Sequence, residues 1–160
     1  MVYFSYSGNT QTVARSIQEE TGGDIFRVTV TDEYPDSYNE MSDRTEKDKS
    51  EQARPELKDS IDEATWAAYD TVFLGYPIWW GDMPMPMYTF LESYDFTGKT
   101  VYPFVTSDSG EFSGTISKIQ SAASGATVID NGLPITTGKI SSAETSVNSW
   151  VEELGLSNEE

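Results

Sequence analysis

The 160-residue sequence contains neither cysteine nor histidine. Without cysteine, it has no disulfide framework, no thiolate nucleophile and no cysteine-ligated metal site. Without histidine, it lacks the imidazole base of Ser-His-Asp and Cys-His catalysis, and it lacks both metal ligands of the HExxH proteases. Difficult chemistry would therefore depend on carboxylates, alone or with a hard cation, or on a bound organic cofactor that brings its own reactivity.

Basic residues are also scarce, because 10 Lys and Arg stand against 27 Asp and Glu, giving a formal net charge of −17. Proteins that bind nucleic acid neutralise phosphates with clustered Lys and Arg, so a nucleic-acid partner is excluded. No run of about 18 apolar residues is present, so we expect no membrane span. The N-terminus has no basic region followed by a long apolar one, so we expect no signal peptide and a cytoplasmic location.

The length predicts a single domain, which we expect to cover residues 1–156 and to be followed by a frayed tail at 157–160. Hydrophobic residues make up 37% of the chain and aromatic residues 12%. Disordered chains have few aromatic residues and little to bury, so this composition indicates a folded protein.

Hydrophobic periodicity predicts strands that alternate with helices. Strands are expected over 2–6, 25–30, 72–76, 100–106 and 126–129, and helices over 10–20, 85–94, 113–123 and 143–154. This alternation is typical of an α/β protein whose parallel sheet is covered on both faces. Residues 31–59 form an acidic insertion too long for an ordinary connection. We interpret it as a solvated helix, and the alternative is that Tyr34 and Tyr38 help to wall a site.

Open parallel sheets bind ligands beyond the carboxyl ends of their strands, so the loops that follow the first, third and fourth strands are candidates. Residues 5–12 combine hydroxyl groups, Gly8 and the start of a helix, which favours a phosphate. No base occurs before Arg15, so the GxxxxGK[ST] nucleotide loop is excluded, and no GxGxxG is present. The same residue types also occur in an ordinary N-capped turn.

The other two candidate loops span residues 75–84 and 106–114. Trp79 and Trp80 are adjacent, so they cannot both point into one core face, and one of them could stack on a planar heterocycle. The alternative is a tryptophan packed under the loop. The third loop offers backbone donors, small side chains and one aromatic ring, although an ordinary turn capped by Ser113 would have the same composition.

These loops resemble those of flavodoxin-like proteins. Residues 4–10, Phe-Ser-Tyr-Ser-Gly-Asn-Thr, are similar to the flavodoxin phosphate loop. Residues 75–81, Gly-Tyr-Pro-Ile-Trp-Trp-Gly, are similar to one branch of the family, as are the Tyr-Pro and Arg-Pro pairs of the insertion and Asp-Phe-Thr-Gly-Lys at 95–99. The resemblance implies a flavodoxin-like three-layer α/β sandwich with a five-stranded parallel sheet in the order 2-1-3-4-5. It also implies FMN bound without covalent attachment.

The resemblance assigns three groups of cofactor-binding residues and no catalytic side chain or metal ligand. The phosphate would be held by Ser5, Ser7, Gly8, Asn9, Thr10 and Thr12. The isoalloxazine would be lined by Pro77, Ile78, Trp79, Trp80 and Gly81. The other side of the ring or its pyrimidine edge would be closed by Ser107, Asp108, Ser109, Gly110 and Phe112. This third loop departs from the electron-carrier flavodoxins, which usually have Cys-Gly-Asp and a stacking tyrosine there.

The resemblance therefore implies a flavoprotein that passes electrons through FMN to a redox partner protein or a small electron acceptor. An NAD(P)H-dependent quinone or azo reductase on the same fold is the alternative, although no basic cluster for the nicotinamide nucleotide lies near the loops. A flavin-free binding module is a second alternative. The protein would be a monomer or a homodimer, because the tryptophan pair could also serve a dimer contact.

Overall fold

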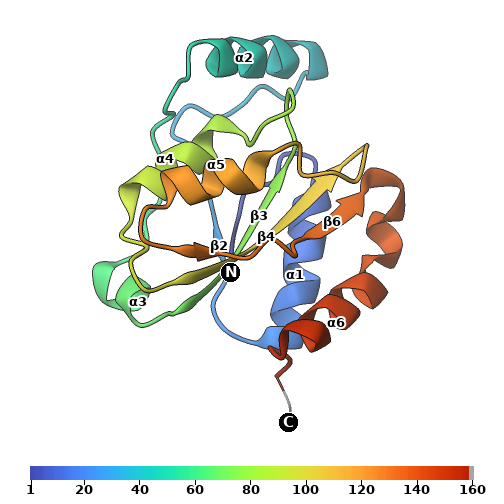
Figure 1. Ribbon diagram of the computed structural model, residues 1–160. Coiled ribbons are helices and arrows are strands. Elements are labelled where there is room, and N and C mark those ends of the chain that lie inside the picture. The colour runs from blue at the N-terminus through green and yellow to red at the C-terminus, as the bar shows by residue number, and fades with distance from the viewer. Residues whose placement is uncertain (159–160) are drawn as a thin grey trace.

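Two long parallel strands, β3 (Thr71–Pro77) and β4 (Thr100–Ser107), form the centre of the sheet in the computed structural model, which describes residues 1–158 (Figure 1). They pair continuously from Thr71 with Thr100 to Pro77 with Thr106. β1 (Val2–Tyr3) pairs with β3, β2 (Phe26–Arg27) pairs with β1, and β5 (Thr127–Val128) pairs with β4. The order β2-β1-β3-β4-β5 confirms the predicted flavodoxin-like α/β topology.

The sheet contains a sixth strand that the sequence pattern did not predict, β6 (Leu133–Thr136). β5 pairs with the beginning of β4, at Thr100 and Val101. β6 pairs with the end of β4, from Phe104 to Ser107. The outer position beside β4 is therefore filled by two short strands in succession rather than by one strand at residues 126–129.

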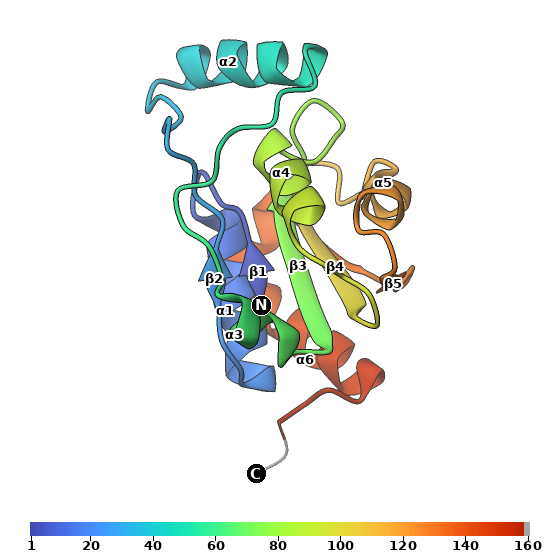
Figure 2. The same cartoon turned by 90° about the vertical axis from the view of Figure 1, so that its left-hand side faces the viewer.

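Helices cover both faces of the sheet, as predicted (Figures 1 and 2). One face carries α1 (Asn9–Thr21) and α6 (Ala143–Leu154), and α6 has the predicted bounds. The other face carries α3 (Glu63–Ala67), α4 (Met85–Ser93) and α5 (Thr115–Ala122). A 3₁₀ helix, η1 (Thr137–Ser142), connects β6 to α6. No helix within residues 1–158 is both long and apolar enough to cross a membrane.

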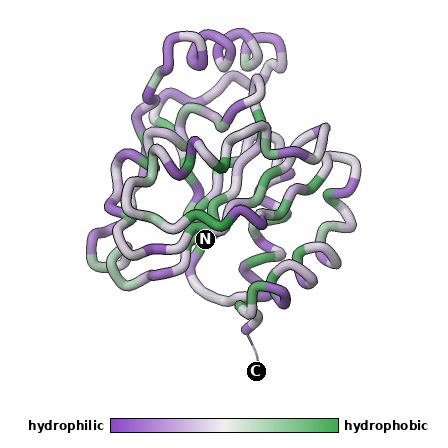
Figure 3. The backbone as a smooth tube through the Cα atoms, viewed as in Figure 1, coloured by the Kyte–Doolittle hydropathy of each residue, from purple (hydrophilic) through white to green (hydrophobic). Residues whose placement is uncertain are grey.

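Each face of the sheet has its own hydrophobic core. On one side, Val13 and Ile17 of α1 pack with Phe104 and with Val147 and Trp150 of α6. On the other side, the core is formed by Leu74, Trp66, Phe90, Phe96 and Ile119 with their neighbours. The hydrophobic residues of the central strands therefore lie between two helical layers, as the colouring of Figure 3 shows.

The two ends of the acidic insertion, residues 31–59, lie next to each other. Val30 and Leu57 form an antiparallel bridge, in which the Thr31 amide donates to the Glu56 carbonyl at 3.0 Å and the Lys58 amide donates to the Thr29 carbonyl at 2.8 Å. Between them lies α2 (Tyr38–Ser50), which extends across the end of the molecule above the carboxyl ends of the strands (Figures 1 and 2). The predicted helix is confirmed, and most of its surface is hydrophilic (Figure 3).

The C-terminal residues that the structure describes return to α1. The Asn158 amide donates to the Glu20 carbonyl at 2.8 Å, so this part of the chain lies against the end of the helix. The frayed tail predicted at 157–160 includes residues 159–160, which lie outside the described residues.

Candidate functional site

A cavity of about 460 Å³ lies at the carboxyl ends of β3 and β4, next to the first turn of α1. This is the end of a doubly wound sheet at which ligands bind, and the volume is in the range of about 300–1,000 Å³ found for small-molecule sites. All three candidate loops contribute to its wall, and one side of α2 completes it. The lining residues are Tyr6, Ser7, Asn9, Thr10, Tyr38, Met41, Ser42, Thr45, Pro77, Ile78, Trp79, Trp80, Thr106, Ser107, Asp108 and Thr137.

The first loop turns sharply at Gly8, whose φ of +99° is a left-handed conformation that favours glycine. The Ser5 hydroxyl oxygen accepts hydrogen bonds from the amides of Gly8, at 3.2 Å, and Gln11, at 3.3 Å. Ser5 is itself buried, so its role is to shape the turn rather than to face the cavity. The Thr12 hydroxyl donates to the Gly8 carbonyl at 3.0 Å and also belongs to this internal framework.

The turn leaves hydrogen-bond donors free at the start of α1. Within residues 1–158, no protein group accepts a hydrogen bond from the amides of Asn9 and Thr10, and no side chain caps the helix. Nothing lies within 4 Å of the position that a Cβ atom of Gly8 would occupy. Free amides at the positive end of a helix dipole, beside an open glycine, form an anion site without a basic side chain. The arrangement fits a phosphate group.

The second loop is a tight hairpin that carries the two tryptophans. Trp79 and Asp82 exchange backbone hydrogen bonds of 2.8 and 3.0 Å, with only Trp80 and Gly81 between them. Both central residues have positive φ, +54° for Trp80 and +70° for Gly81. Positive φ at both central residues is typical of a type I′ turn, the tight turn that suits a two-residue hairpin.

Trp79 is packed into an aromatic cluster, whereas Trp80 is 47% exposed. The Trp79 ring makes edge-to-face contacts with Phe4 at 5.2 Å, Tyr34 at 5.4 Å and Tyr6 at 6.0 Å. The indole Nε1 of Trp80 donates to the Thr45 hydroxyl at 3.0 Å, and Lys49 Nζ donates to the Trp80 carbonyl. Helix α2 therefore fixes the exposed tryptophan in position.

The Asp82 side chain, at the end of the hairpin, is buried and is not part of the cavity wall. Its Oδ1 accepts hydrogen bonds from the Met83 amide at 2.7 Å and the Tyr88 hydroxyl at 2.6 Å, and it lies 3.2 Å from Lys118 Nζ. Burial and the adjacent Asp82 carboxylate raise the pKa of Tyr88, so the phenol remains a donor. We name Asp82, Tyr88 and Lys118 the loop clamp, because they connect the second loop to α4 and α5.

Breaking the loop clamp is expected to reveal coupling between its charges. In Lys118→Met, the Asp82 carboxylate would stay buried without its cation, and we expect a loss of about 1–2 kcal/mol, less than for a fully buried pair because Lys118 is partly exposed. Asp82→Asn should lower the free energy of unfolding much less in the Lys118→Met background than in the wild type. Urea denaturation of the four proteins measures this, and additive single effects would contradict the coupling.

In the third loop, as in the first, a serine hydroxyl oxygen accepts hydrogen bonds from backbone amides of the turn. The Ser107 hydroxyl oxygen accepts from the amides of Gly110 at 3.0 Å and Glu111 at 3.2 Å, which closes the turn. Asp108 lines the cavity and accepts a hydrogen bond from the Thr137 hydroxyl. The helix that follows begins after Gly114 without a side-chain cap, so Ser113 is not the N-cap.

The structure brings most of the predicted site residues together. Those that line the cavity are Ser7, Asn9, Thr10, Pro77, Ile78, Trp79, Trp80, Ser107 and Asp108. The others, Ser5, Gly8, Thr12, Gly81, Ser109, Gly110 and Phe112, are not part of its wall. Ser5, Gly8 and Gly81 shape turns. The Phe112 ring packs against Gly132 and the core.

Several lining residues were not assigned from the sequence: Tyr6, Met41, Ser42, Thr45, Thr106 and Thr137. Tyr38 was considered only as an alternative, and it does line the cavity; Tyr34 packs behind Trp79 instead. A signal for the α2 residues is present in the sequence, because positions 38, 41, 42 and 45 recur at helical spacing. Thr106 is buried and its hydroxyl lies 2.8 Å from that of Thr10, which joins β4 to the first loop.

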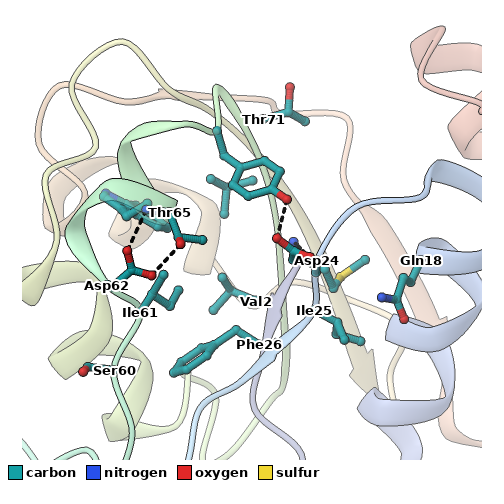
Figure 4. A pocket seen from close by; sticks show the side chains of 14 residues that line it. Val2, Gln18, Asp24, Ile25, Phe26, Ser60, Ile61, Asp62, Thr65 and Thr71 are labelled. Carbon is teal, nitrogen blue, oxygen red and sulfur yellow. Dashed lines mark hydrogen bonds between the residues drawn. The ribbon is translucent and has the colours of Figure 1, made fainter.

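A second cavity, of about 440 Å³, lies at the opposite end of the sheet, beside the beginnings of β2 and β3 (Figure 4). Its size is similar, so volume does not distinguish the two cavities. Its wall includes the carboxylates of Asp24 and Asp62, and Asp62 caps α3 by accepting from the Thr65 amide at 3.1 Å. Two carboxylates oppose an anionic ligand, so the cavity at the carboxyl ends of the strands is the candidate site.

The sheet is doubly wound and parallel, and an amide-rich turn, an aromatic hairpin and a third loop surround one cavity at the carboxyl ends of its strands. This combination defines a nucleotide-binding α/β protein. The family model described as Flavodoxin matches residues 1–154. The chain belongs to the flavodoxin family.

Solved structures agree with this assignment. A protein from Bacteroides uniformis ATCC 8492 is 28% identical with a TM-score of 0.79, covering 94% of this chain and 95% of its own. A flavoprotein from Lactobacillus acidophilus NCFM, solved in complex with FMN, is 25% identical with a TM-score of 0.67 over 88% of this chain and 94% of its own. A Fusobacterium nucleatum flavodoxin bound to flavin mononucleotide shares the fold, with 16% identity and a TM-score of 0.58 over 96% of this chain and 94% of its own. No curated protein sequence matches the chain.

Proposed function

We propose that this protein binds FMN without a covalent bond and transfers electrons through it to a redox partner protein or a small acceptor. The observation that carries the proposal is the meeting of free helix amides, a tryptophan hairpin and a polar third loop around one cavity. Membership of the flavodoxin family and the FMN complex of a similar flavoprotein support FMN as the cofactor.

Each wall of the cavity suits one part of FMN. The amides of Asn9 and Thr10, with the Ser7 hydroxyl, would hold the phosphate at the positive end of the α1 dipole. Trp79 and Trp80 would provide the apolar wall for the ring system. Ser107 and Asp108 would supply polar contacts on the third side. Bound FMN supplies the reversible redox chemistry, and the protein supplies binding, orientation and electrostatics, so neither cysteine nor histidine is required.

An NAD(P)H-dependent reductase is less well supported, because no lysine or arginine among residues 1–158 lines the cavity. Two lysines that contact the hairpin are already engaged, since Lys49 donates to the Trp80 carbonyl and Lys118 pairs with Asp82. The additional phosphates of a nicotinamide nucleotide would therefore have no charged partner there. A flavin-free module is also less well supported, because the anion-binding turn keeps its free amides.

Titration of the purified apoprotein with FMN tests the proposal. We expect saturable quenching of tryptophan fluorescence with one FMN per chain and a dissociation constant below 1 μM, about 8 kcal/mol of binding free energy. NADPH and menadione are then added to the FMN-loaded protein. Slow or absent turnover without a partner protein is expected, whereas rapid steady-state turnover would identify a reductase. Absence of FMN binding would leave the flavin-free module.

A further inference from the structure

Helix α2 forms part of the cavity wall but is not anchored in the hydrophobic interior. Its buried residues are Met41 and Thr45, and both line the cavity. Among residues 1–158, the two hydrophobic cores include no residue of this helix. Most helices of folded proteins are stabilised by packing an apolar face against a core. Since α2 lacks this packing, it is held in place mainly by polar contacts.

The segments on either side of α2 are fixed to the body of the protein. Before the helix, the Tyr6 hydroxyl donates to the Pro35 carbonyl. After the helix, the Arg54 guanidinium donates to the Glu92 carboxylate of α4 at 2.8 Å. Between α2 and Arg54, Gln52 has a φ of +50°, a left-handed conformation that is uncommon for a residue with a side chain. The helix therefore lies between two fixed points, with a sharp turn next to one of them.

Two residues of α2 bind the helix to the tip of the tryptophan hairpin. Trp80 Nε1 donates to the Thr45 hydroxyl at 3.0 Å, and Lys49 Nζ donates to the Trp80 carbonyl. We name Thr45, Lys49 and Trp80 the latch. Beside it, the Arg44 guanidinium stacks on the Tyr34 ring at 4.2 Å. Contacts of this kind can break in a local opening while both hydrophobic cores stay intact.

The latch joins two walls of the cavity. Thr45 lines the cavity from α2 and Trp80 lines it from the hairpin, so the hydrogen bond between them closes the space between the two elements. Helix α2 itself extends across the carboxyl ends of the strands (Figure 2). Lys49 strengthens the latch from outside, because it is not among the residues that line the cavity. A molecule that lies against the hairpin can pass α2 only when the latch is open.

We propose that α2 is a hinged lid whose latch sets the rates at which FMN enters and leaves the cavity. The inference rests on the proposed function, because FMN is the molecule that the lid retains. Opening swings the helix between its two fixed ends and breaks both hydrogen bonds of the latch. A weaker latch therefore raises the release and association rates together and leaves the affinity nearly unchanged. A residue that only contacts FMN would change the release rate and the affinity together.

Stopped-flow kinetics of Lys49→Met test the lid. Association is followed by tryptophan quenching on mixing with FMN, and release by the rise of flavin fluorescence on dilution. Because a charge-assisted hydrogen bond is lost, both rates should rise about tenfold, with the dissociation constant within about threefold of the wild type. Lys47→Met is the matched control, since it removes the same charge from an exposed position of the same helix. It should leave both rates within about twofold of the wild type.

Opening of the lid can also be measured without FMN, because the chain has no cysteine. Met85 is 4% exposed and lies next to Thr45 and Lys49 of α2, outside the wall of the FMN cavity. In protein freed of FMN, the thiol of Met85→Cys should react with 4,4′-dithiodipyridine about tenfold faster when Lys49→Met is added. Val147→Cys places a thiol in the other core, where Val147 is fully buried, and reports unfolding of the whole protein. Its reaction should be slow and equal in both backgrounds.

The outcomes distinguish this inference from the proposed function. Unchanged rates in Lys49→Met, or a faster release with an equal loss of affinity, would overturn the lid while FMN binding stands. Equal acceleration of thiol labelling at positions 85 and 147 would also overturn it, because Lys49→Met would then act through general destabilisation. Failure of the wild type to bind FMN would overturn the proposed function and the role of the lid in it, whereas the labelling would still show whether α2 opens.

Discussion

Replacing Gly8 by alanine is expected to weaken FMN binding about a hundredfold while leaving the protein folded. Gly8 has a φ of +99°, and alanine in a left-handed conformation is strained by about 1–2 kcal/mol. The loop can relieve this strain only by moving, and then the Asn9 and Thr10 amides no longer point at one anion. A hundredfold loss corresponds to about 2.7 kcal/mol of binding free energy. Fluorescence titration of the apoprotein with FMN measures it.

A matched control for the strain is available at the opposite end of the same helix. Gly23 has a φ of +85°, and nothing lies within 4 Å of its Cβ position, but it follows the other end of α1. Gly23→Ala should therefore lose a similar amount of stability in urea and keep the FMN affinity of the wild type. If both variants lost FMN equally, the effect would come from general destabilisation and the anion-binding role of the first turn would be wrong.

Gly75→Ala should have the largest effect on stability. Gly75 lies in β3 directly opposite Phe104 in β4, and a Cβ atom there would lie 2.0 Å from Cζ of the Phe104 ring. The ring is fully buried and packed between the sheet and the helices α1 and α6, so it cannot move away without displacing its neighbours. Overpacking of this kind typically costs about 1–3 kcal/mol, and the close approach to a fully buried ring places Gly75→Ala at the upper end of that range. Urea denaturation of Gly75→Ala measures the loss.

Shortening the opposing side chain provides the test of cause. In the double variant Gly75→Ala with Phe104→Leu, the added methyl group has room. Gly75→Ala should therefore cost less stability in the Phe104→Leu background than in the wild type. If the double variant were as unstable as the sum of both single variants, the steric explanation would be contradicted.

The sequence predicted the strand order because local pattern and family resemblance agreed along most of the chain. β6 was missed for a local reason: Gly132, Pro134 and their neighbours have the composition of a turn. Proline is tolerated on an edge strand, where its missing amide would face away from the ladder. In the part of the chain that the structure describes, β6 pairs with β4 alone, so it is such an edge.

The sequence predicted the part of the candidate site that short loops form. It missed the part that depends on tertiary contacts. Ser7, Asn9 and Thr10 follow directly from a strand, a glycine and a helix start. The contribution of α2 depends on contacts between distant residues, above all the Val30–Leu57 bridge, and no local pattern predicts that pairing. Similarly, charge alone did not show that Asp82 is neutralised by Lys118, which lies 36 positions further along the chain.

The bridge between Val30 and Leu57 also has a consequence for how such proteins can diversify. Because the two ends of the inserted segment are hydrogen-bonded neighbours at the edge of the sheet, its length can change with little cost in loop entropy and without altering strand order. Residues 31–59 therefore form an exchangeable cassette. A relative could replace this cassette and so change the wall that α2 gives to the cavity, while keeping the three loops at the strand ends.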